Sequence, residues 1–351
     1  MGSWLGFQSV QAQSAAAVKS AKAPILTAGG DNAVMFSYRH AYHAGNHADV
    51  LKHITLIALL DYLTQKDKTL SCIDTHAGIG IYPLRGQEAQ TSGEAAGGIF
   101  ALQDWLTGQK KADVAPAIAR YAQVVQATGN PNIYPGSPWL MQYLLRTDLG
   151  APVQDKLHLF ELNPRDARLL QGNLDGLLPR NALQLKDSDG FTALKALLPP
   201  PSRRALVLID PSYELKTDYG QVASVLEDAL VRFATGCYAI WYPIVGRQEA
   251  HDLPRRLKKI CATAGKDWLH ATFNIGTGDD AYTPDPKLSR TATGRYVPVA
   301  ANKVHTGLRE SGMFIVNPPF VLAEQLQAAL PQLKTALGQG ASSSYLLEAS
   351  A

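Results

Sequence analysis

The run of five aliphatic residues Ala205–Ile209 restricts the fold more than any other feature, because such a run is buried on both sides. An uninterrupted apolar run that ends at a proline-containing turn is typical of a central strand in a parallel sheet. Other apolar runs alternate with segments of helical periodicity, such as 47–65 and 164–177, and this alternation predicts βαβ units. We therefore expect a mostly parallel sheet of about seven strands, at 70–74, 157–161, 182–186, 205–209, 237–242, 269–275 and 312–316.

Some segments stand apart from this alternation. Residues 82–132 are polar with a helical pattern, which predicts an inserted helical subdomain. Residues 276–309 are polar and basic, and we expect an extended loop, since stretches of this length without secondary structure are usually functional or disordered. Residues 1–34 are rich in Ala, Ser and Gln and are interpreted as a flexible leader or as residues upstream of the true start. One α/β domain is thus expected over 35–340, with a tail over 341–351.

The composition excludes several classes of protein. With 351 residues, of which 46% are hydrophobic and 18% charged, the chain can bury a large core and is neither disordered nor fibrous. The net charge of +3 is only mildly basic, so any contact with nucleic acid depends on local clusters. No apolar run is long enough to span a membrane. The isolated cysteines lack a Cys-x-x-Cys pair and predict reduced thiols in a cytoplasmic protein; they are Cys72, Cys237 and Cys261.

Acidic residues and glycines follow the first three predicted strands. The segment Asp74–Gly80 has the form Asp-x-x-x-Gly-x-Gly, in which glycines let the backbone turn tightly beside a ligand. Glu161 follows the second strand, where an acid can accept hydrogen bonds from ribose hydroxyls, and an Asp-Gly pair at 189–190 follows the third. Each motif alone is equally compatible with an ordinary turn or cap. Together they predict one crevice with the layout of a class I S-adenosylmethionine-dependent methyltransferase.

The fourth strand leads into Asp210-Pro211-Ser212-Tyr213, a set of groups suited to an adenine amine. That amine is a poor nucleophile because its lone pair is delocalised into the ring. The Asp210 carboxylate and the Pro211 carbonyl can act as two acceptors for it, and Asp210 can take the leaving proton. Tyr213 can stack on a base that has been flipped out of its helix. The alternative is a strand-to-helix turn in which Asp210 serves only as a cap.

Two further motifs have competing interpretations. The segment that precedes the first strand carries histidines at spacings that could bind zinc, but no cysteine is near and Gly45-Asn46 interrupts the helix, so we expect no metal there. The tetrapeptide Asn317–Phe320 also fits an adenine-amine motif. Its preceding strand is expected to run antiparallel, which would place it at the wrong edge of the sheet. The histidines concerned are His40, His43, His47 and His53.

The chain resembles the RlmJ family of bacterial 23S ribosomal RNA adenine-N6 methyltransferases in Ser37–His53, Asp74–Gly78, Tyr134–Pro138 and Ile209–Glu214. The resemblance runs from Met35 to about Leu337 and implies a Rossmann-like, seven-stranded methyltransferase domain with a helical insertion. The chain departs from the family pattern at Ser212, where the family usually has a second proline, and in its extended 276–309 loop.

The resemblance also implies particular site residues. It makes Asp210 the proton acceptor, with Pro211 and Tyr213 beside it, and Tyr38 a contact with the target RNA. It places S-adenosylmethionine among His53, His76, Ser137, Glu161, Asp189, Gly190 and Asp210, to which the glycine motif adds Gly78. Phosphate contacts are expected from the loop at 287–309 and from Arg39, Lys52, Arg203 and Arg204.

The activity expected on this basis is methylation of the N6 amino group of a specific adenine in 23S ribosomal RNA. The enzyme is expected to be a monomer that acts on protein-free or partly assembled RNA. Two alternatives stay open. A DNA adenine-N6 methyltransferase would use the same tetrapeptide, and a non-catalytic nucleic-acid-binding protein that handles external DNA would keep the scaffold with a degenerate site.

Overall fold

A sheet of eight strands forms the centre of the molecule, which is described here by a computed structural model. The structure describes residues 39–147, 152–175, 183–276, 288–290, 296–298 and 307–350. The sheet has the strand order β12-β8-β11-β7-β6-β1-β4-β5. Its strands are β1 (Ser71–Asp74), β4 (Lys156–Phe160), β5 (Leu183–Lys186), β6 (Ala205–Ile209), β7 (Cys237–Ile244), β8 (Trp268–Asn274), β11 (Glu310–Val316) and β12 (Ser344–Ala349).

The direction of the strands determines where a ligand can bind. β5, β4, β1, β6 and β7 are joined by parallel pairing, so their carboxyl ends meet at one edge of the sheet. β11 is antiparallel to both β7 and β8, as expected for the last of the predicted strands. The sequence missed one strand. Residues 341–351 were expected to be a tail, but β12 pairs antiparallel with β8 and ends the sheet on that side.

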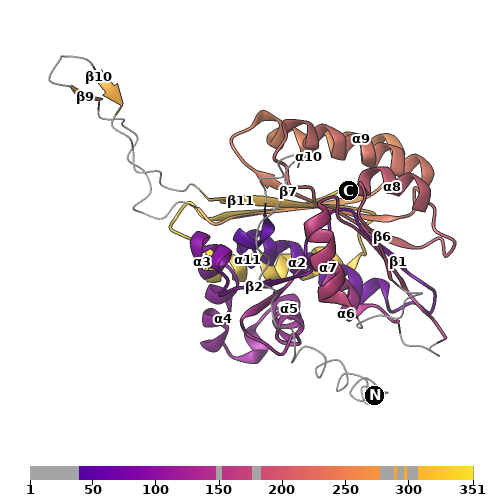
Figure 1. The fold of residues 1–351 in the computed structure, drawn as a ribbon, viewed down its shortest axis with the longest axis horizontal. Coiled ribbons are helices and arrows are strands. Elements are labelled where there is room, and N and C mark those ends of the chain that lie inside the picture. The colour runs from indigo at the N-terminus through magenta and orange to yellow at the C-terminus, as the bar shows by residue number, and fades with distance from the viewer. Residues whose placement is uncertain are drawn as a thin grey trace.

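Helices cover both faces of the sheet, as the fully buried run of β6 requires. Figure 1 shows α8 (Gly190–Leu197), α9 (Lys216–Arg232) and α10 (Gln248–Ala264) on one face. The other face is covered by α2 (His47–Leu63), α6 (Ser137–Leu144), α7 (Pro164–Leu174) and α11 (Val321–Leu337). α2 is buried over most of its length, because it lies between the sheet and a further layer of helices.

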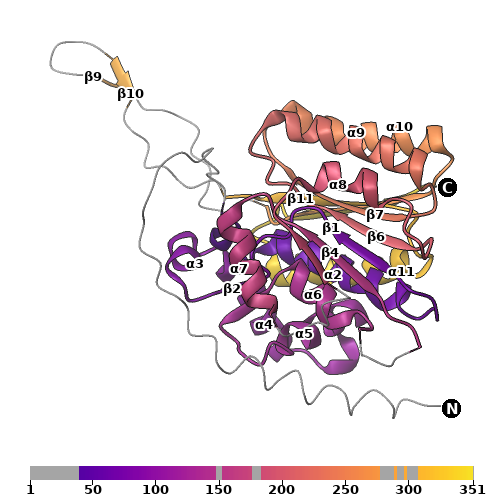
Figure 2. The same cartoon turned by 45° about the vertical axis from the view of Figure 1, so that its right-hand side comes forward.

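This further layer is formed by residues 82–132, which were predicted to be helical. It contains α3 (Gln87–Ser92), α4 (Ile99–Thr107) and α5 (Pro116–Gln126), with the 3₁₀ turns η3 (Glu94–Gly97) and η4 (Lys111–Asp113). The antiparallel pair β2 (Ile81–Pro83) and β3 (Ile133–Pro135) connects it to the sheet. We call residues 81–135 the insert. Figure 2 shows the insert packed against α2 and α11, and a short turn, η2 (His40–Tyr42), precedes α2.

Several predicted segments lie outside the described residues. These are residues 1–34, Tyr38 and most of the loop at 276–309, in which Gly276, the antiparallel pair β9 (Leu288–Arg290) and β10 (Tyr296–Pro298) and residues 307–309 are described. Within the described ranges, no helix is both long and apolar enough to cross a membrane. The three cysteines are buried and none forms a disulfide.

Candidate active site

The residues predicted to follow the first four strands come together at the carboxyl edge of the parallel strands. The backbone N–H of Thr75, after β1, donates to the carbonyl of Leu208 in β6 at 3.1 Å. The N–H of Gly78 donates to Glu161 Oε2, after β4, at 2.8 Å. Gly190, after β5, lies so close to Thr75 that a Cβ would overlap with the Thr75 carbonyl. The glycine therefore permits a close approach between two of the loops that line the crevice.

Glu161 organises the glycine loop that follows β1. Its Oε1 accepts the Asn163 N–H at 2.8 Å, and its Oε2 holds the Gly78 N–H. Gly78 has φ +62, in the left-handed region, and a Cβ there would overlap with the Tyr82 hydroxyl. Burial raises the pKa of Glu161. Since a carboxylate oxygen can accept more than one hydrogen bond, Glu161 keeps acceptor capacity for a ligand.

Asp189 is the N-cap of α8. Its Oδ1 accepts the Phe191 N–H at 3.0 Å and its Oδ2 accepts the Thr192 hydroxyl at 2.5 Å. An ordinary turn or cap was the alternative interpretation of this Asp-Gly pair, and in the structure Asp189 does cap α8. The cap also holds the carboxylate at the edge of the crevice, next to Gly190.

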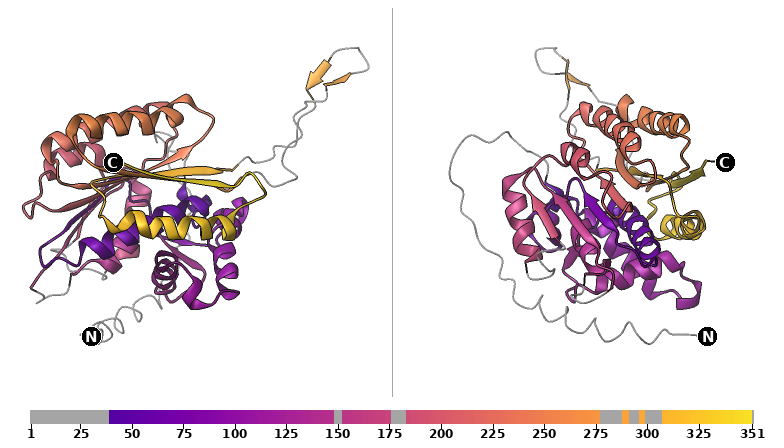
Figure 3. Two further views of the ribbon diagram at one scale, coloured as in Figure 1. Left: turned by 180° about the vertical axis from the view of Figure 1, so that it is seen from behind. Right: turned by 90° about the vertical axis from the view of Figure 1, so that its right-hand side faces the viewer.

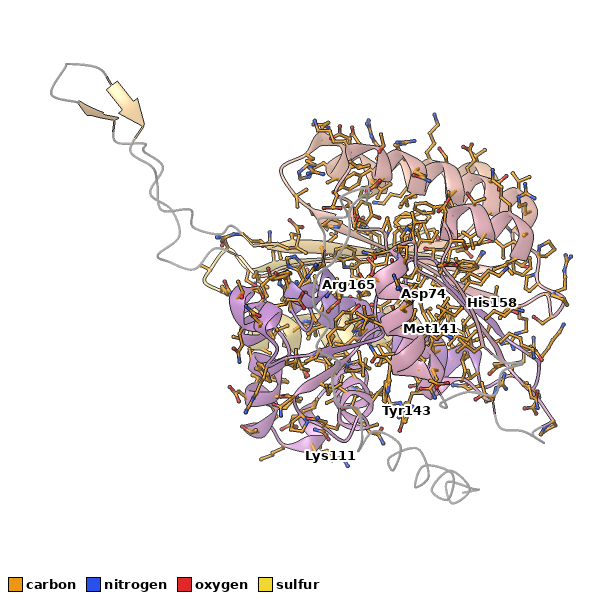
Figure 4. All side chains as sticks on the ribbon, viewed as in Figure 1. Asp74, Lys111, Met141, Tyr143, His158 and Arg165 are labelled. Atoms are coloured by element: carbon orange, nitrogen blue, oxygen red, sulfur yellow. The ribbon has the colours of Figure 1, made fainter. Side chains whose placement is uncertain are left out.

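Asp74, at the end of β1 (Figure 4), was predicted only as the start of a glycine motif, yet it is the most buried acid of the crevice. Its Oδ1 accepts the His76 N–H at 3.2 Å, and the Ser137 hydroxyl donates to the same carboxyl group. Its Oδ2 is buried and has no hydrogen-bond partner among the described residues. Burial raises the pKa of Asp74 to about 7. An acid at the end of a fully buried strand is the signal that could have marked it in the sequence.

The two histidines predicted for the cofactor site are both held in the neutral form. Burial lowers the pKa of His76 to about 4, and its Nδ1 lies 2.8 Å from the Thr75 hydroxyl. Burial lowers the pKa of His53 to about 3. His53 Nδ1 lies 2.8 Å from the Tyr134 hydroxyl, which is bonded in turn to Tyr121. His53 Nε2 is a second buried polar atom without a partner in the described part of the chain.

Lys52 is paired with the predicted proton acceptor. Its ammonium lies 2.7 Å from Asp210 Oδ2 and 2.9 Å from Asp49 Oδ1, and its side chain is only 5% exposed. Burial lowers the pKa of Lys52, but the charges of Asp210 and Asp49 outweigh this effect and raise it overall, so the ammonium stays charged. Lys52 was expected to contact RNA phosphates. In this structure its ammonium is buried between two carboxylates and does not face a phosphate backbone.

Tyr213 does not offer a stacking face in this structure, contrary to the prediction. Its side chain is buried, its ring packs 4.6 Å from that of Tyr219, and its hydroxyl donates to the Trp241 carbonyl at 2.7 Å. The backbone turn that directs this side chain inward has a positive φ of +53 at Tyr213. The sequence pattern does not reveal such a backbone conformation. Pro211 is also buried, whereas Ser212 is exposed.

The basic residues predicted to contact RNA fall into two groups. The exposed Arg39 lies on the side of the crevice and pairs with Glu88 of α3 at 2.9 Å. Arg204 donates to the carbonyls of Leu63 and Lys68, and Arg203 precedes it. Arg203 and Arg204 precede β6 and lie at the opposite edge of the sheet from the crevice, and their contact with RNA phosphates stays a prediction.

The competing motif at Asn317 is excluded by geometry, as expected. Its side-chain amide donates to the carbonyls of Ala234 and Gly236 at 3.0 and 2.7 Å. These residues precede β7, so the motif lies at the amino edge of the parallel strands, away from Asp210.

Comparison with known proteins identifies the family. The family model described as ribosomal RNA large subunit methyltransferase D, RlmJ, matches residues 67–283. Ribosomal RNA large subunit methyltransferase J of Escherichia coli is 38% identical over 86% of this chain and 94% of its own length. The protein of the same name from Haemophilus influenzae is 38% identical over 88% of this chain and 97% of its own length. The chain belongs to the RlmJ family.

The RlmJ assignment agrees with a solved structure. A crystal structure of a protein from Legionella pneumophila has a TM-score of 0.68 and 32% identity, and the match covers 87% of this chain and 98% of that one. The predicted class I methyltransferase fold is thereby confirmed, apart from the number of strands. As a member of the RlmJ family, the chain is an S-adenosylmethionine-dependent methyltransferase of ribosomal RNA.

Proposed function

We propose that this enzyme methylates the N6 amino group of one adenine in 23S ribosomal RNA, as a cytoplasmic monomer that acts on protein-free or partly assembled RNA. The observation that carries the proposal is the position of Asp210. Its carboxylate follows β6 at the edge shared with the glycine loop, is 12% exposed, and is bonded through Oδ2 to a buried ammonium. A weakly nucleophilic amine requires a carboxylate that is held in place beside the site of the methyl donor.

The residues of the crevice fit S-adenosylmethionine. Two buried polar atoms, Asp74 Oδ2 and His53 Nε2, have no partner among the described residues, although buried polar groups are normally hydrogen-bonded. We assign the ribose hydroxyls to Glu161, the adenine to Asp189 and Gly190, and the methionine ammonium to Asp74. When bound, the cofactor supplies a methyl group on a positively charged sulfur. The protein contributes position and charge.

The Lys52 ammonium positions the acceptor. It holds one oxygen of Asp210 at 2.7 Å, which leaves the other oxygen available to the amine. The Pro211 carbonyl is the second acceptor, and Asp210 would take the proton that leaves the amine as the N–C bond forms and the bond from the methyl carbon to the cofactor sulfur breaks. The nearby negative charge of Asp49 keeps Lys52 from neutralising Asp210 completely.

A pocket beside Lys52 is the candidate site for the target base. It is lined by His40, His43, Asn46, Ala48, Asp49, Trp241, Pro243 and Leu308. Lys52 Nζ lies 5.5 Å from the centre of the Trp241 ring, so the pocket opens next to the Lys52–Asp210 pair. Trp241 lines this pocket and Tyr213 does not, so Trp241 is the aromatic side chain that we assign to the base.

The test is a search for N6-methyladenine by mass spectrometry in 23S ribosomal RNA from a strain that lacks the gene. The modification should be absent and should return with the wild-type gene, but not with Asp210→Asn. An unchanged modification profile in the deletion strain would overturn the proposal. Purified enzyme should methylate ribosomal RNA and leave adenine in duplex DNA unmodified, and the reverse result would favour the DNA alternative.

A further inference from the structure

The insert holds the start of α2 through one acidic residue. Glu94, in η3, accepts a hydrogen bond from Asn46 Nδ2 at 2.9 Å and lies 2.9 Å from His43 Nδ1. The N–H of Ile99 donates to the Gly45 carbonyl at 2.7 Å, and Gly98 permits this approach because a Cβ there would overlap with the same carbonyl. The insert thus fixes the residues from which α2 begins.

A continuous series of hydrogen bonds leads from this contact to Asp210. Asn46 caps α2, since its Oδ1 accepts the Asp49 N–H at 2.9 Å. Asp49 Oδ2 accepts the Gly45 N–H at 2.9 Å, and Asp49 Oδ1 pairs with Lys52 at 2.9 Å. Lys52 completes the series at Asp210, 2.7 Å away. A long, flexible lysine side chain has many rotamers, so its position depends on the carboxylate that holds it.

We propose that Glu94 is a positioning residue for methyl transfer, which acts through Asn46 and Asp49 to hold Lys52 against Asp210. This inference rests on the role proposed above for Asp210. Glu94 touches neither Lys52 nor Asp210. Its effect reaches them because it anchors the first turn of α2, the segment that carries both Asn46 and Asp49.

The charge on His43 strengthens this anchor. Burial lowers the pKa of His43, but the hydrogen bond and charge of Glu94 outweigh burial and raise it overall. Asp49 raises it further, and among the described residues His47 also faces Glu94, where burial holds His47 neutral with a pKa of about 4. Below the raised pKa of His43, its bond to Glu94 is charge-assisted and stronger. At higher pH, the neutral imidazole still bonds to the Glu94 carboxylate, but the attraction between two opposite charges is lost.

A matched control exists at the other end of α2. Asp61 pairs with Arg120 of α5 at 2.8 and 3.0 Å, so it also joins α2 to the insert. Asp61 is near the end of the helix, far along it from Lys52. Asp61→Asn and Glu94→Gln therefore remove comparable contacts between the same two parts of the protein.

The experiment measures single-turnover methyl transfer from labelled S-adenosylmethionine to 23S ribosomal RNA. Glu94→Gln should lower the rate about tenfold, because small misplacements of catalytic groups are costly, with cofactor affinity unchanged. The loss should be larger at pH 6 than at pH 8, and Glu94→Asp should restore part of the rate. Asp61→Asn should keep the wild-type rate, although both variants lower the unfolding temperature by a similar few degrees.

A double-mutant cycle separates positioning from a general structural effect. In a Lys52→Met background, Glu94→Gln should cause no further loss of rate. A wild-type rate for Glu94→Gln, or the same tenfold loss in both backgrounds, would overturn the inference. If Glu94→Gln does not fold, His43→Gln replaces it in the same cycle with the same criteria. A failure of the proposed function is detected separately, because the Asp210→Asn variant would then methylate the RNA at the wild-type rate.

Discussion

Individual residues of the crevice explain why its charges are arranged as they are. Asp74 and His53 are buried and His76 is half-buried, and desolvation favours the neutral form of each. Lys52 and Asp49 are buried as well, yet both are charged, because Asp210 and Asp49 stabilise the Lys52 ammonium and His40 and Lys52 stabilise the Asp49 carboxylate. The crevice therefore contains one fixed cluster of charged side chains around Asp210. Its other titratable groups are neutral, and a charged ligand can change their protonation.

Asp74 should make cofactor binding depend on pH. With a pKa of about 7, its carboxyl is protonated at pH 6 and ionised at pH 8, and only the ionised form attracts an ammonium. Affinity for S-adenosylhomocysteine, measured by calorimetry, should rise several-fold from pH 6 to pH 8. Asp74→Asn should bind about tenfold more weakly at pH 8 and lose this dependence. Methylthioadenosine, which has no ammonium, serves as the control and should bind both forms equally.

Ser212 should tolerate the proline that is usual in the family. Its side chain is exposed, and the groups assigned to chemistry are the Asp210 carboxylate and the Pro211 carbonyl. Ser212→Pro should therefore change the rate of methyl transfer less than about twofold, within the range typical of surface substitutions. A tenfold change in either direction would mean that the turn itself limits the reaction.

At the scale of elements, β12 closes one side of the sheet and ties α10 to it. β12 pairs with β8 along Ser344–Ala349, and Glu348 is bonded to Lys258 of α10 at 2.5 Å and lies 3.3 Å from His270 of β8. The segment joins three elements, although the sequence pattern alone marked it only as a tail.

Removal of residues 344–351 should destabilise the enzyme without altering the crevice. The deletion exposes the backbone groups of β8 and the apolar side chains beneath β12. The unfolding temperature should fall by several degrees, as measured by differential scanning calorimetry, while affinity for S-adenosylhomocysteine at low temperature stays unchanged. Glu348→Gln, which removes one charge and keeps the strand, should cause a smaller decrease.

At the scale of the whole molecule, buried neutral histidines should set its sensitivity to acid. His47, His53 and His76 have pKa values of about 4, 3 and 4 in the folded protein, below the ordinary 6.5. At pH values between 6.5 and these lower pKa values, the unfolded chain binds more protons than the folded protein does. The free energy of unfolding therefore decreases as the pH falls through this range. Asp74 has the opposite effect, since its raised pKa reduces stability as the pH rises from about 4 to about 7.

The three histidines together outweigh Asp74, and each contributes on the order of 1–3 kcal/mol. The free energy of unfolding in urea should therefore decrease from pH 7 to pH 5. Asp74→Asn should raise stability at pH 8 more than at pH 5 in the absence of cofactor. A free energy that increases toward pH 5 would show that these histidines are accessible to protons in the folded state.

The sequence was sufficient for the framework of the site but not for its contacts. Apolar runs and their terminal residues predicted the parallel strands and placed Asp74, Glu161, Asp189 and Asp210 at one edge, because strand direction alone determines this. The pair formed by Lys52 and Asp210 joins residues that are 158 positions apart, which no local pattern encodes.

The antiparallel position of β12 has a consequence for how the enzyme is made. β12 follows α11 in the chain, and its partner β8 lies well before it. Because synthesis runs from the N-terminus, the earlier strands can pair before β12 has emerged from the ribosome. Until β12 arrives, one edge of β8 can therefore pair with a strand of another molecule.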